Sequence, residues 1–406
     1  MKTLFPTLTI SLLAAAAFAV PSVSNVVLSQ GDNGIVKITY DLADDQGIVL
    51  FDILTNGVSV GDSKITHAVG DVNRKIAPGT GKTIYWSCAK DAPEVEGSTM
   101  SAVVTAYSLD NPPDVMVLDL ANTNGLFFCK SLAALPDGGL DNDIYRTSRL
   151  VMKKVPAKGV TFLSGLPGRT DKYAPFLAKF TYDYFLGIYP VTQGQQLVLE
   201  GLTRSTNTSG DEASLRPVDN VSWVDLRYYT GWPREAQNEF THDNIVSTGN
   251  NILWKFRSFG LPIDMPTSAE WEYACRAGSQ TRVGNGTDDE AGMARMAWYS
   301  GNAGGTTHPV GLKEPNAWGF YDMHGNVYEW CLDQYRNTSL SNRDVVRIDY
   351  PGETTASSGF DHYKTRRGGS YAKTWEECSS HVTLEGQYEA GTYKCGYRIC
   401  VKAVIP

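Results

Sequence analysis

The sequence of 406 residues predicts two folded parts: a small all-β sandwich, then a larger α+β domain with little regular secondary structure. Three observations lead to this prediction. The first part alternates apolar and polar residues with a period of two, as half-buried strands do. The chain is rich in Gly (39), Trp (9) and Tyr (21), which suits short strands joined by loops. Beyond residue 150, only a few helix-start signals interrupt long aromatic and glycine-rich stretches.

The first 19 residues have the features of a secretory signal peptide. Lys2 supplies a positive charge, an Ala-rich apolar run follows, and Ala17-Phe18-Ala19 is a small-residue cleavage site. We expect residues 1–19 to be removed and the mature chain to be secreted or periplasmic, after bacterial-type export. Export would place the seven cysteines in an oxidising compartment, where disulfides are permitted. Because seven is odd, at least one thiol stays unpaired or pairs between chains.

Residues 20–109 are predicted to form the β-sandwich. Apolar side chains recur at every second position from Val36 to Leu42, and turn residues separate the strands. Similar runs lie at residues 47–55, 83–88 and 101–108. Strands this short at this spacing are typical of an immunoglobulin or fibronectin type III domain. Pro112-Pro113 marks an exposed linker, and residues 110–149 are predicted to connect the sandwich to a second domain at 150–406.

Three helix starts are recognisable in the second domain. Ser222 followed by Asp225, and Thr267 followed by Glu270, are N-cap pairs that predict helices running to about residue 230 and to residue 277. Gly278 would follow the second helix as a good C-terminal residue. Thr192, with a glutamine three residues later, marks the third start.

The charge balance argues against nucleic acid as a partner. The chain has 36 basic and 44 acidic residues, a net charge of −8, and so has no basic excess with which to displace counterions. Beyond the N-terminal segment, no apolar stretch reaches the roughly 18 residues that a membrane-spanning helix needs. We therefore expect no membrane span after signal cleavage.

Six stretches of the second domain, in this order, resemble the formylglycine-generating enzyme, or sulfatase-modifying factor, family. They are TYDYFLGIYPVT (181–192), RPVDNVSWVD (216–225), LPIDMPTSAEWEYACRAG (261–278), YSGNAGGTTHPVGLKEPNAWGFYDMHGNVYEW (299–330), RRGGSY (366–371) and GYRIC (396–400). The resemblance covers roughly residues 150–404. It implies an irregular variant of the C-type lectin fold. The family's enzymes oxidise a sulfatase cysteine to formylglycine, using two cysteines that bind copper(I).

The resemblance also implies that this chain has an incomplete thiol pair. The first cysteine should lie two residues after the Gly-Gly-Ser-aromatic motif, where the chain has Lys373, and the second matches Cys378. An ammonium group is not a ligand for a soft ion, so copper is not expected. Cys378 also matches a structural cysteine that the family pairs with one on the EWEY-x-C helix, here Cys275. A Cys275–Cys378 disulfide is therefore expected. The pairing of the other cysteines stays open: Cys88, Cys129, Cys331, Cys395 and Cys400.

Two further groups of site residues follow from the resemblance. Family members bind calcium through loop carbonyls and side-chain oxygens, which suit this ion. The matching positions are Asn302 and Ala303 in one segment, and Asn326, Val327 and Glu329 in another. The alternative for Glu329 is a buried carboxylate paired with an arginine such as Arg367 or Arg398. Trp330, Ser370 and Cys378 are candidates for lining the groove of the enzymes, although the tryptophan also suits a core position.

The six histidines do not predict a metal site, because none lies within eight residues of another. The iron-dependent sulfoxide synthases of the same family use three clustered histidines, so that chemistry is not expected here. The histidines are interpreted as isolated residues of surface loops.

The sequence favours an exported protein whose second domain binds a glycan or a protein outside the cytoplasm. The long loops of the second domain, with aromatic residues in 205–260 and 336–365, are suited to recognition. The alternative is an oxidoreductase that converts a protein cysteine to formylglycine, using Cys378 with a second thiol such as Cys395 or Cys400. Copper binding by one or two thiols distinguishes the two hypotheses.

Overall fold

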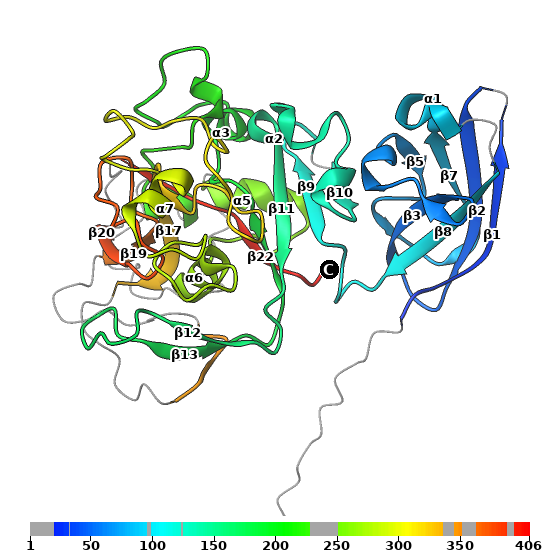
Figure 1. The fold of residues 1–406 in the computed structure, drawn as a ribbon. Helices are drawn as coiled ribbons and strands as arrows, with labels where there is room; N and C mark the ends of the chain where they lie inside the picture. Colours follow the sequence, from blue (N-terminus) through cyan, green and yellow to red (C-terminus); the bar gives the residue numbers. More distant parts are fainter. Residues whose placement is uncertain are drawn as a thin grey trace, which may run out of the picture.

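The computed structural model describes residues 20–31, 33–95, 99–122, 125–227, 251–335, 345–350, 363–387 and 394–406. These residues form a β-sandwich, coloured blue to cyan in Figure 1, and a larger second part. The C-terminus lies close to the junction between the two. The predicted signal peptide, residues 1–19, lies outside the described residues. Within the described ranges, the helices are all too short or too polar to cross a membrane.

The N-terminal part consists of two β-sheets packed face to face, as the sequence predicts. One sheet has the strand order β1 (Ser22–Gln30), β2 (Ile35–Ala43), β7 (Gly79–Ser87), β5 (Ala68–Gly70). The other is β4 (Val58–Ser59), β3 (Gly47–Thr55), β6 (Lys75–Ile76), with β8 (Met100–Tyr107) also paired to β3. The alternating residues from Val36 to Leu42 are buried between the sheets. The all-β prediction is confirmed, and the immunoglobulin-like assignment stays a prediction.

A five-stranded antiparallel sheet forms the centre of the second part. Its order is β10 (Leu126–Cys129), β9 (Val115–Asp119), β11 (Arg149–Val155), β14 (Tyr184–Gly187), β22 (Cys400–Lys402). Residues 110–149 were expected only to connect the two parts, but they supply two strands of this sheet. The reason lies in the run from Val115 to Leu118, which is buried on both faces of the sheet. Such continuous apolar runs suit fully covered strands.

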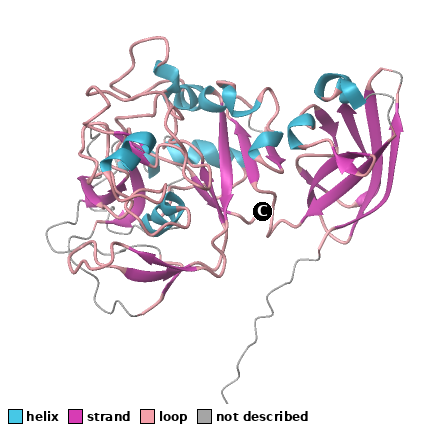
Figure 2. Ribbon diagram, viewed as in Figure 1, coloured by secondary structure: helices cyan, strands magenta, loops and turns pink. Residues whose placement is uncertain are grey.

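The rest of the second part is short elements joined by loops, and Figure 2 shows how much of it is loop. A second sheet has the order β20 (Leu384–Gln387), β19 (Tyr363–Arg367), β17 (Tyr328–Gln334), β21 (Cys395–Gly396). Smaller sheets contain β12 (Thr161–Ser164), β13 (Phe176–Lys179) and β18 (Arg347–Ile348), and β15 (Ala297–Trp298) with β16 (His324–Gly325). This is the irregular α+β fold that the sequence predicts.

Short helices surround these sheets, and the three predicted starts are confirmed. The helices are α2 (Ile144–Thr147), α3 (Gln193–Glu200), α4 (Trp223–Arg227), α5 (Ile252–Phe256), α6 (Ser268–Arg276) and α7 (Glu290–Met296), and the predicted starts are those of α3, α4 and α6. Thr267 Oγ1 accepts a hydrogen bond from the Glu270 N–H at 3.1 Å, and the Glu270 carboxylate accepts one from the Thr267 N–H at 2.7 Å. Helix α6 ends with Ala277 in the left-handed conformation, one residue before the predicted glycine. The predicted end of α4 lies outside the described residues.

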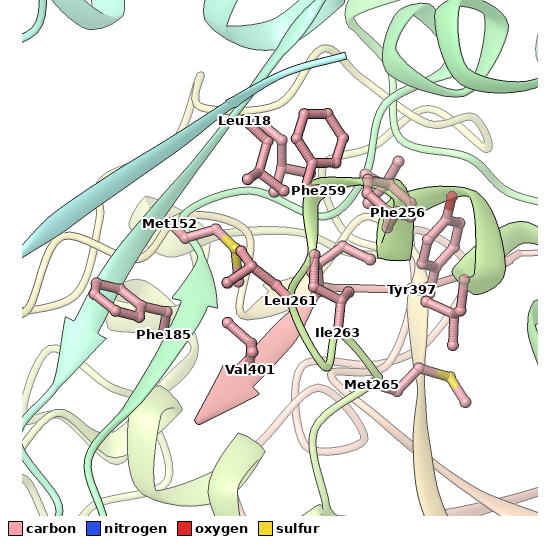
Figure 3. Packing of buried hydrophobic residues seen from close by; sticks show 14 of the residues in the cluster. Leu118, Met152, Phe185, Phe256, Phe259, Leu261, Ile263, Met265, Tyr397 and Val401 are labelled. Carbon is pink, nitrogen blue, oxygen red and sulfur yellow. The ribbon is translucent and has the colours of Figure 1, made fainter. Parts of the chain in front are cut away.

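Two apolar clusters cover the two faces of the central sheet. Figure 3 shows one of them, in which Leu118, Met152 and Phe185 of the sheet pack near Phe259 and Leu261. The opposite face contacts α6, including Trp271, and loop residues such as Phe320. The central sheet thereby fixes α6 on one side, and α6 positions the polar groups described below.

The two parts of the molecule touch along β10. The Phe128 N–H donates to the Asn73 carbonyl at 2.8 Å, and Asp62 contacts Lys130 at 3.2 Å. Ile48 of the sandwich is fully buried in the apolar cluster of the second part. The predicted linker is not exposed as expected, because both residues of the Pro112-Pro113 pair are buried.

Candidate functional site

The three predicted groove residues are all inside the protein. Trp330, Ser370 and Cys378 have no exposed surface. The Trp330 indole N–H donates to the Val221 carbonyl at 2.8 Å, and its ring belongs to the core beside the central sheet. Ser370 and Cys378 do lie together, since the Cys378 sulfur is 3.8 Å from the Ser370 carbonyl oxygen. Trp330 is therefore a core residue here, and the described surroundings of all three residues are closed.

The predicted Cys275–Cys378 disulfide is absent from the structure, in which both cysteines are free and buried. The His324 ring contacts both residues. Its Nε2 lies 3.5 Å from the Cys275 sulfur and accepts from the Gly284 N–H at 3.0 Å, so its Nδ1–H donates to the Cys378 carbonyl at 2.7 Å. Burial lowers the pKa of His324 to about 4, which keeps the ring neutral. A neutral imidazole held at both nitrogens thus links the two residues in place of a covalent bond.

Cys378 lacks the properties of a reactive thiol. Burial raises its pKa to about 12, so the thiol stays protonated at neutral pH. Lys373, at the position of the family's first cysteine, forms an ion pair with Glu377 at 2.7 Å. The other candidate thiols pack elsewhere. Cys378 belongs to a cluster with Met293 and Met296, whereas Cys331, Cys395 and Cys400 belong to the two clusters of the central sheet.

The second predicted calcium segment is an ion pair in this structure. Arg398 donates to both oxygens of Glu329, at 2.7 and 3.0 Å, and the Trp271 indole N–H donates to one of them at 2.7 Å. Both Glu329 and Arg398 are buried. Of the two arginines considered for this role, Arg398 is the partner. Calcium would have to displace a guanidinium that already neutralises the carboxylate, so this arrangement does not fit the ion.

The asparagines of the calcium segments hold backbone turns together. Asn302 accepts from the Tyr299 N–H at 2.9 Å, and Asn326 accepts from the His308 N–H at 3.1 Å. The Ala303 carbonyl lies 2.9 Å from His308 Nε2. Val327 is buried. Among the described residues, no three His, Cys, Asp or Glu side chains come together as a metal site. The side-chain oxygens of Asn302 and Asn326 and the Ala303 carbonyl are therefore engaged within the protein.

A different site is formed by polar residues between α6 and the second sheet. We call it the polar pocket. It has a volume of about 50 Å³, and its lining includes Ser164, Tyr173, Glu272, Asp333, Gln334 and His381. These residues come from separate segments of the chain: the end of β12 and the loop that follows it, helix α6, the end of β17 and the loop before β20.

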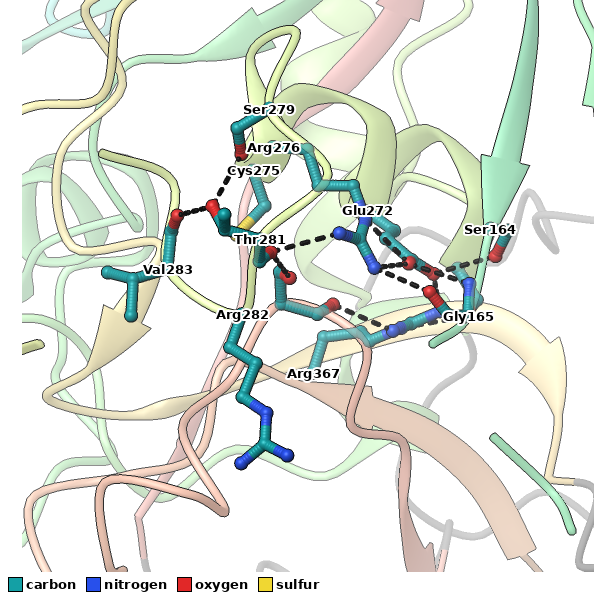
Figure 4. A network of polar contacts seen from close by, with 12 residues as sticks. Ser164, Gly165, Glu272, Cys275, Arg276, Ser279, Thr281, Arg282, Val283 and Arg367 are labelled. Carbon is teal, nitrogen blue, oxygen red and sulfur yellow. Dashed lines mark hydrogen bonds and ion pairs between the residues drawn. The ribbon is translucent and has the colours of Figure 1, made fainter. Parts of the chain in front are cut away.

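A buried ion network forms one wall of the polar pocket. Glu272 contacts Arg276 at 2.8 Å and Arg367 at 3.0 Å, and it accepts from the Ser164 hydroxyl and the Gly165 N–H. Figure 4 shows these groups converging on the Glu272 carboxylate. Burial opposes ionisation of Glu272, but the two guanidinium groups outweigh it and lower its pKa to about 2. This wall is therefore permanently charged, and its Glu272 carboxylate is fully engaged.

The lining of the pocket also contains groups with unused hydrogen-bonding capacity. His381 Nδ1 and Gln334 Oε1 are buried and have no partner in the protein. Burial raises the pKa of Asp333 to about 7, although its carboxylate accepts from the Ser268 N–H at 2.5 Å. Burial also lowers the pKa of His381 to about 4, so this ring is neutral. The prediction that the histidines lie in surface loops is wrong for His381, of which 7% is exposed.

Sequence reasoning missed the polar pocket because no motif contains it. Asp333 and Gln334 lie three and four residues after the end of the recognised 299–330 stretch, and His381 follows Cys378 by three residues. Two adjacent polar residues at the end of an apolar strand were the available signal. Their proximity to His381 depends on how β17 and β19 pair, which the sequence pattern does not specify.

A larger cleft, of about 390 Å³, lies between the sandwich and the second part. It is lined by apolar residues such as Phe51 and Phe127 and by charged residues that are already paired. Asp62 contacts Lys130 at 3.2 Å, and Arg149 contacts Asp137 at 2.6 Å. Its chemistry therefore gives no comparable indication of a ligand.

Comparison with known proteins gives a consistent family assignment. Residues 150–403 match the sulfatase-modifying factor enzyme 1-like domain. Over 221 residues the chain is 29% identical to the chaperone protein LppX of Paenibacillus barcinonensis, covering 43% of this chain and 76% of LppX. It is 35% identical over 169 residues to the formylglycine-generating enzyme of Mus musculus, covering 39% of this chain and 36% of the mouse enzyme.

The comparison with solved structures also gives similar proteins. The Treponema denticola variable protein 1 matches with a TM-score of 0.49 and 24% identity, over 63% of this chain and 95% of that protein.

Proposed function

The chain belongs to the sulfatase-modifying factor family, and we propose that it is an exported, ligand-binding member that does not carry out copper-thiolate catalysis. The observation that carries this proposal is the isolation of Cys378. Copper(I) in this chemistry needs two sulfur ligands at one point. Lys373 replaces one sulfur, and the buried, protonated Cys378 is the other.

None of the three thiols considered as replacements, Cys331, Cys395 and Cys400, packs with Cys378. Cys331 and Cys400 pack on one face of the central sheet, Cys395 packs on the other, and Cys378 belongs to a separate cluster. Burial raises the pKa values of Cys331 and Cys400 well above the usual range for a thiol. Deprotonating such groups to make copper ligands would place uncompensated charge in an apolar environment.

The ligand of the proposed binding function is a glycan or a protein outside the cytoplasm. LppX, which shares 29% identity with this chain, is described as a chaperone protein, and that description agrees with a protein ligand. The polar pocket agrees with a small polar group, such as part of a glycan. Residues 228–250 of the first aromatic loop and most of the second loop lie outside the described residues. In the described part of the first loop, Trp223, Phe256 and Phe259 are buried, so these loops add nothing to the choice.

The alternative is an oxidoreductase of the formylglycine-generating type, and its support is the 35% identity with the mouse enzyme. The chain spans 36% of that enzyme, so whole-protein activity does not follow from the match. The separate packing of Cys378, Cys395 and Cys400 weighs against this alternative.

An activity assay separates the two hypotheses. The mature chain is incubated with a Cys-x-Pro-x-Arg peptide, copper and oxygen, and aldehyde formation is followed by mass spectrometry. The mouse formylglycine-generating enzyme serves as the positive control, and Cys378→Ala as the matched variant. We expect no aldehyde from either form of this protein. Aldehyde formed by the natural chain and lost in Cys378→Ala would establish the oxidoreductase instead.

Export has its own test. The proposal predicts that protein recovered outside the cytoplasm begins near Val20, after the Ala17-Phe18-Ala19 site. Mass spectrometry of the recovered N-terminal peptide measures this directly. Recovery of chains that retain residues 1–19 would contradict the proposed cleavage.

A further inference from the structure

We propose that the polar pocket is a subsite that binds the hydroxyl groups of a saccharide. This inference rests on the proposed binding function and assigns it a ligand class and a place. The first argument is the pair of buried atoms without protein partners, His381 Nδ1 and Gln334 Oε1. Burying such groups without hydrogen bonds costs free energy, so a site that leaves two of them facing one pocket is suited to a polar ligand.

The available hydrogen-bonding groups match hydroxyls. The side-chain amide oxygen of Gln334, Oε1, needs a donor, whereas a neutral imidazole nitrogen is a donor or an acceptor according to its tautomer. A hydroxyl group both donates and accepts, so two neighbouring hydroxyls satisfy both atoms. Asp333 provides a third polar contact at the same end of β17.

The charges around the pocket favour a neutral ligand. Glu272 is already compensated by Arg276 and Arg367, which leaves an excess of positive charge on that wall. Lys172 adds another positive charge at the lining, where its ammonium donates to the Tyr335 hydroxyl at 2.7 Å. These cations oppose a cationic ligand. The unpartnered side-chain oxygen of Gln334 is a hydrogen-bond acceptor and opposes an anion.

The size and lining of the pocket limit the ligand to one side of a sugar ring. Its volume of about 50 Å³ corresponds to about three to five water-sized groups, at roughly 10–15 Å³ each. Tyr173, which lies edge-on to His381 with ring centroids 5.6 Å apart, and Tyr350 line the pocket beside these polar groups. Aromatic rings provide apolar surface for the C–H face of a sugar, next to the groups that bind its hydroxyls.

Binding of simple sugars by the mature chain tests the proposal. Glucose, galactose, mannose and N-acetylglucosamine are screened by saturation-transfer NMR, and affinities are then measured by calorimetry. Gln334→Leu removes the unpartnered side-chain oxygen and keeps a side chain of similar volume. His381→Phe removes the ring nitrogens but keeps an aromatic ring beside Tyr173. We expect at least one sugar to bind, and each variant to weaken its binding by about tenfold or more, as expected for loss of a hydrogen bond in a desolvated site.

Gln196→Leu is the matched control, because Gln196 also has a buried, unpartnered side-chain oxygen but lies on α3, outside the pocket. It should bind sugar as the natural chain does, and thermal unfolding checks that all three variants fold. Absence of sugar binding, or binding unaffected by the pocket variants, would overturn the subsite. So would occupation of the pocket by a serine- or threonine-containing peptide in preference to every sugar. These results leave the proposed function standing, because they concern one subsite and not the thiol chemistry or the export, each of which has its own test.

Discussion

Glu272 illustrates how one buried carboxylate organises its surroundings. It is fully buried, and it accepts hydrogen bonds from Ser164, from a backbone N–H and from two arginines. The ion pairs orient Arg367, which in turn donates to the Ser268 hydroxyl at 2.8 Å and to the Ser380 carbonyl at 3.1 Å. The residues next to the polar pocket are therefore held by one charge network.

We predict that Glu272→Gln destabilises the protein by roughly 3–5 kcal/mol, because it leaves two buried guanidinium groups without a countercharge. The free energy of unfolding in urea measures this. Glu314→Gln is the control, since its ion pair with Arg295 is exposed, and it should cost less than about 1 kcal/mol. Equal effects of the two substitutions would contradict the structural role of the network. Because the pKa of Glu272 is lowered, its contribution is present above pH 4.5 and is lost as the pH falls towards 2.

Asp333 has the opposite pH dependence. Burial raises its pKa from 3.8 to about 7, so the folded state favours the protonated form. Its stabilising contribution is complete below pH 3.8 and is lost as the pH rises through 7. We predict that the stability of Asp333→Asn relative to the natural chain increases by about 1–3 kcal/mol between pH 5 and pH 9.

Urea unfolding of Asp333→Asn at the two pH values measures the difference. Asp211→Asn, at an exposed loop position, is the control and should show no such pH dependence. A stability difference that does not change between pH 5 and pH 9 would show that the Asp333 carboxyl titrates normally. The comparison cancels every other titrating group, because both chains share them.

At the scale of single elements, α6 shows how local sequence fixes a start. Thr267 and Glu270 satisfy each other's backbone N–H groups, and the Asp333 carboxylate accepts from the next N–H, that of Ser268. Helix α6 carries Glu272 and Arg276 to the polar pocket and Trp271 to Glu329. The cap therefore positions both buried ion networks.

We predict that Thr267→Ala destabilises the protein by about 1 kcal/mol, the usual cost of losing an N-cap hydroxyl. Thr267→Ser retains the hydroxyl and should remain within a few tenths of a kcal/mol of the natural chain. Chemical denaturation of the three proteins under the same conditions makes the comparison. If serine were as damaging as alanine, the methyl group rather than the hydrogen bond would be the important feature.

The elements differ in how well the sequence predicts them. The sandwich strands were predictable because each has one buried face, which imposes alternation from Val36 to Leu42. The helix starts were predictable because capping is local. Strands such as β15, β16 and β21 contain two residues each, too few for any periodic signal. The run at Val115–Asp119 was interpreted as a connection because a strand buried on both faces does not alternate.

The candidate site was less predictable than the fold. The family motifs located Ser370 and Cys378 together, but they could not show that Glu329 pairs with Arg398 or that His324 joins Cys275 to Cys378. Those contacts join residues that are 49 to 69 positions apart in the chain. Such contacts follow from tertiary packing, which a sequence motif does not encode.

At the scale of the whole molecule, the sandwich and the second part form a continuous structure. The Ile405 N–H donates to the Leu109 carbonyl at 2.8 Å, so the C-terminal segment holds the junction in place. Asp62 of the sandwich accepts from the Ser131 hydroxyl at 2.7 Å and pairs with Lys130 at 3.2 Å. Leu109 itself is buried. In the connection between β8 and β9, Leu109, Pro112 and Pro113 are therefore buried, whereas Asp110, Asn111 and Asp114 are exposed.

This arrangement predicts that the junction resists proteolysis in the natural chain. Cleavage needs several residues of extended, accessible backbone, and residues 108–114 gain that access when the two parts separate. Asp62→Ala removes the ion pair and the Ser131 hydrogen bond together, so we expect cleavage within 108–114 to become several times faster, as a loss of about 1 kcal/mol at the junction would produce.

Glu94→Ala, which removes the exposed Lys64 pair within the sandwich, is the control and should leave the rate unchanged. Mass spectrometry of the fragments measures both position and rate. Rapid cleavage at 108–114 in the natural chain, or equal rates in all three proteins, would mean that Asp62 does not hold the two parts together.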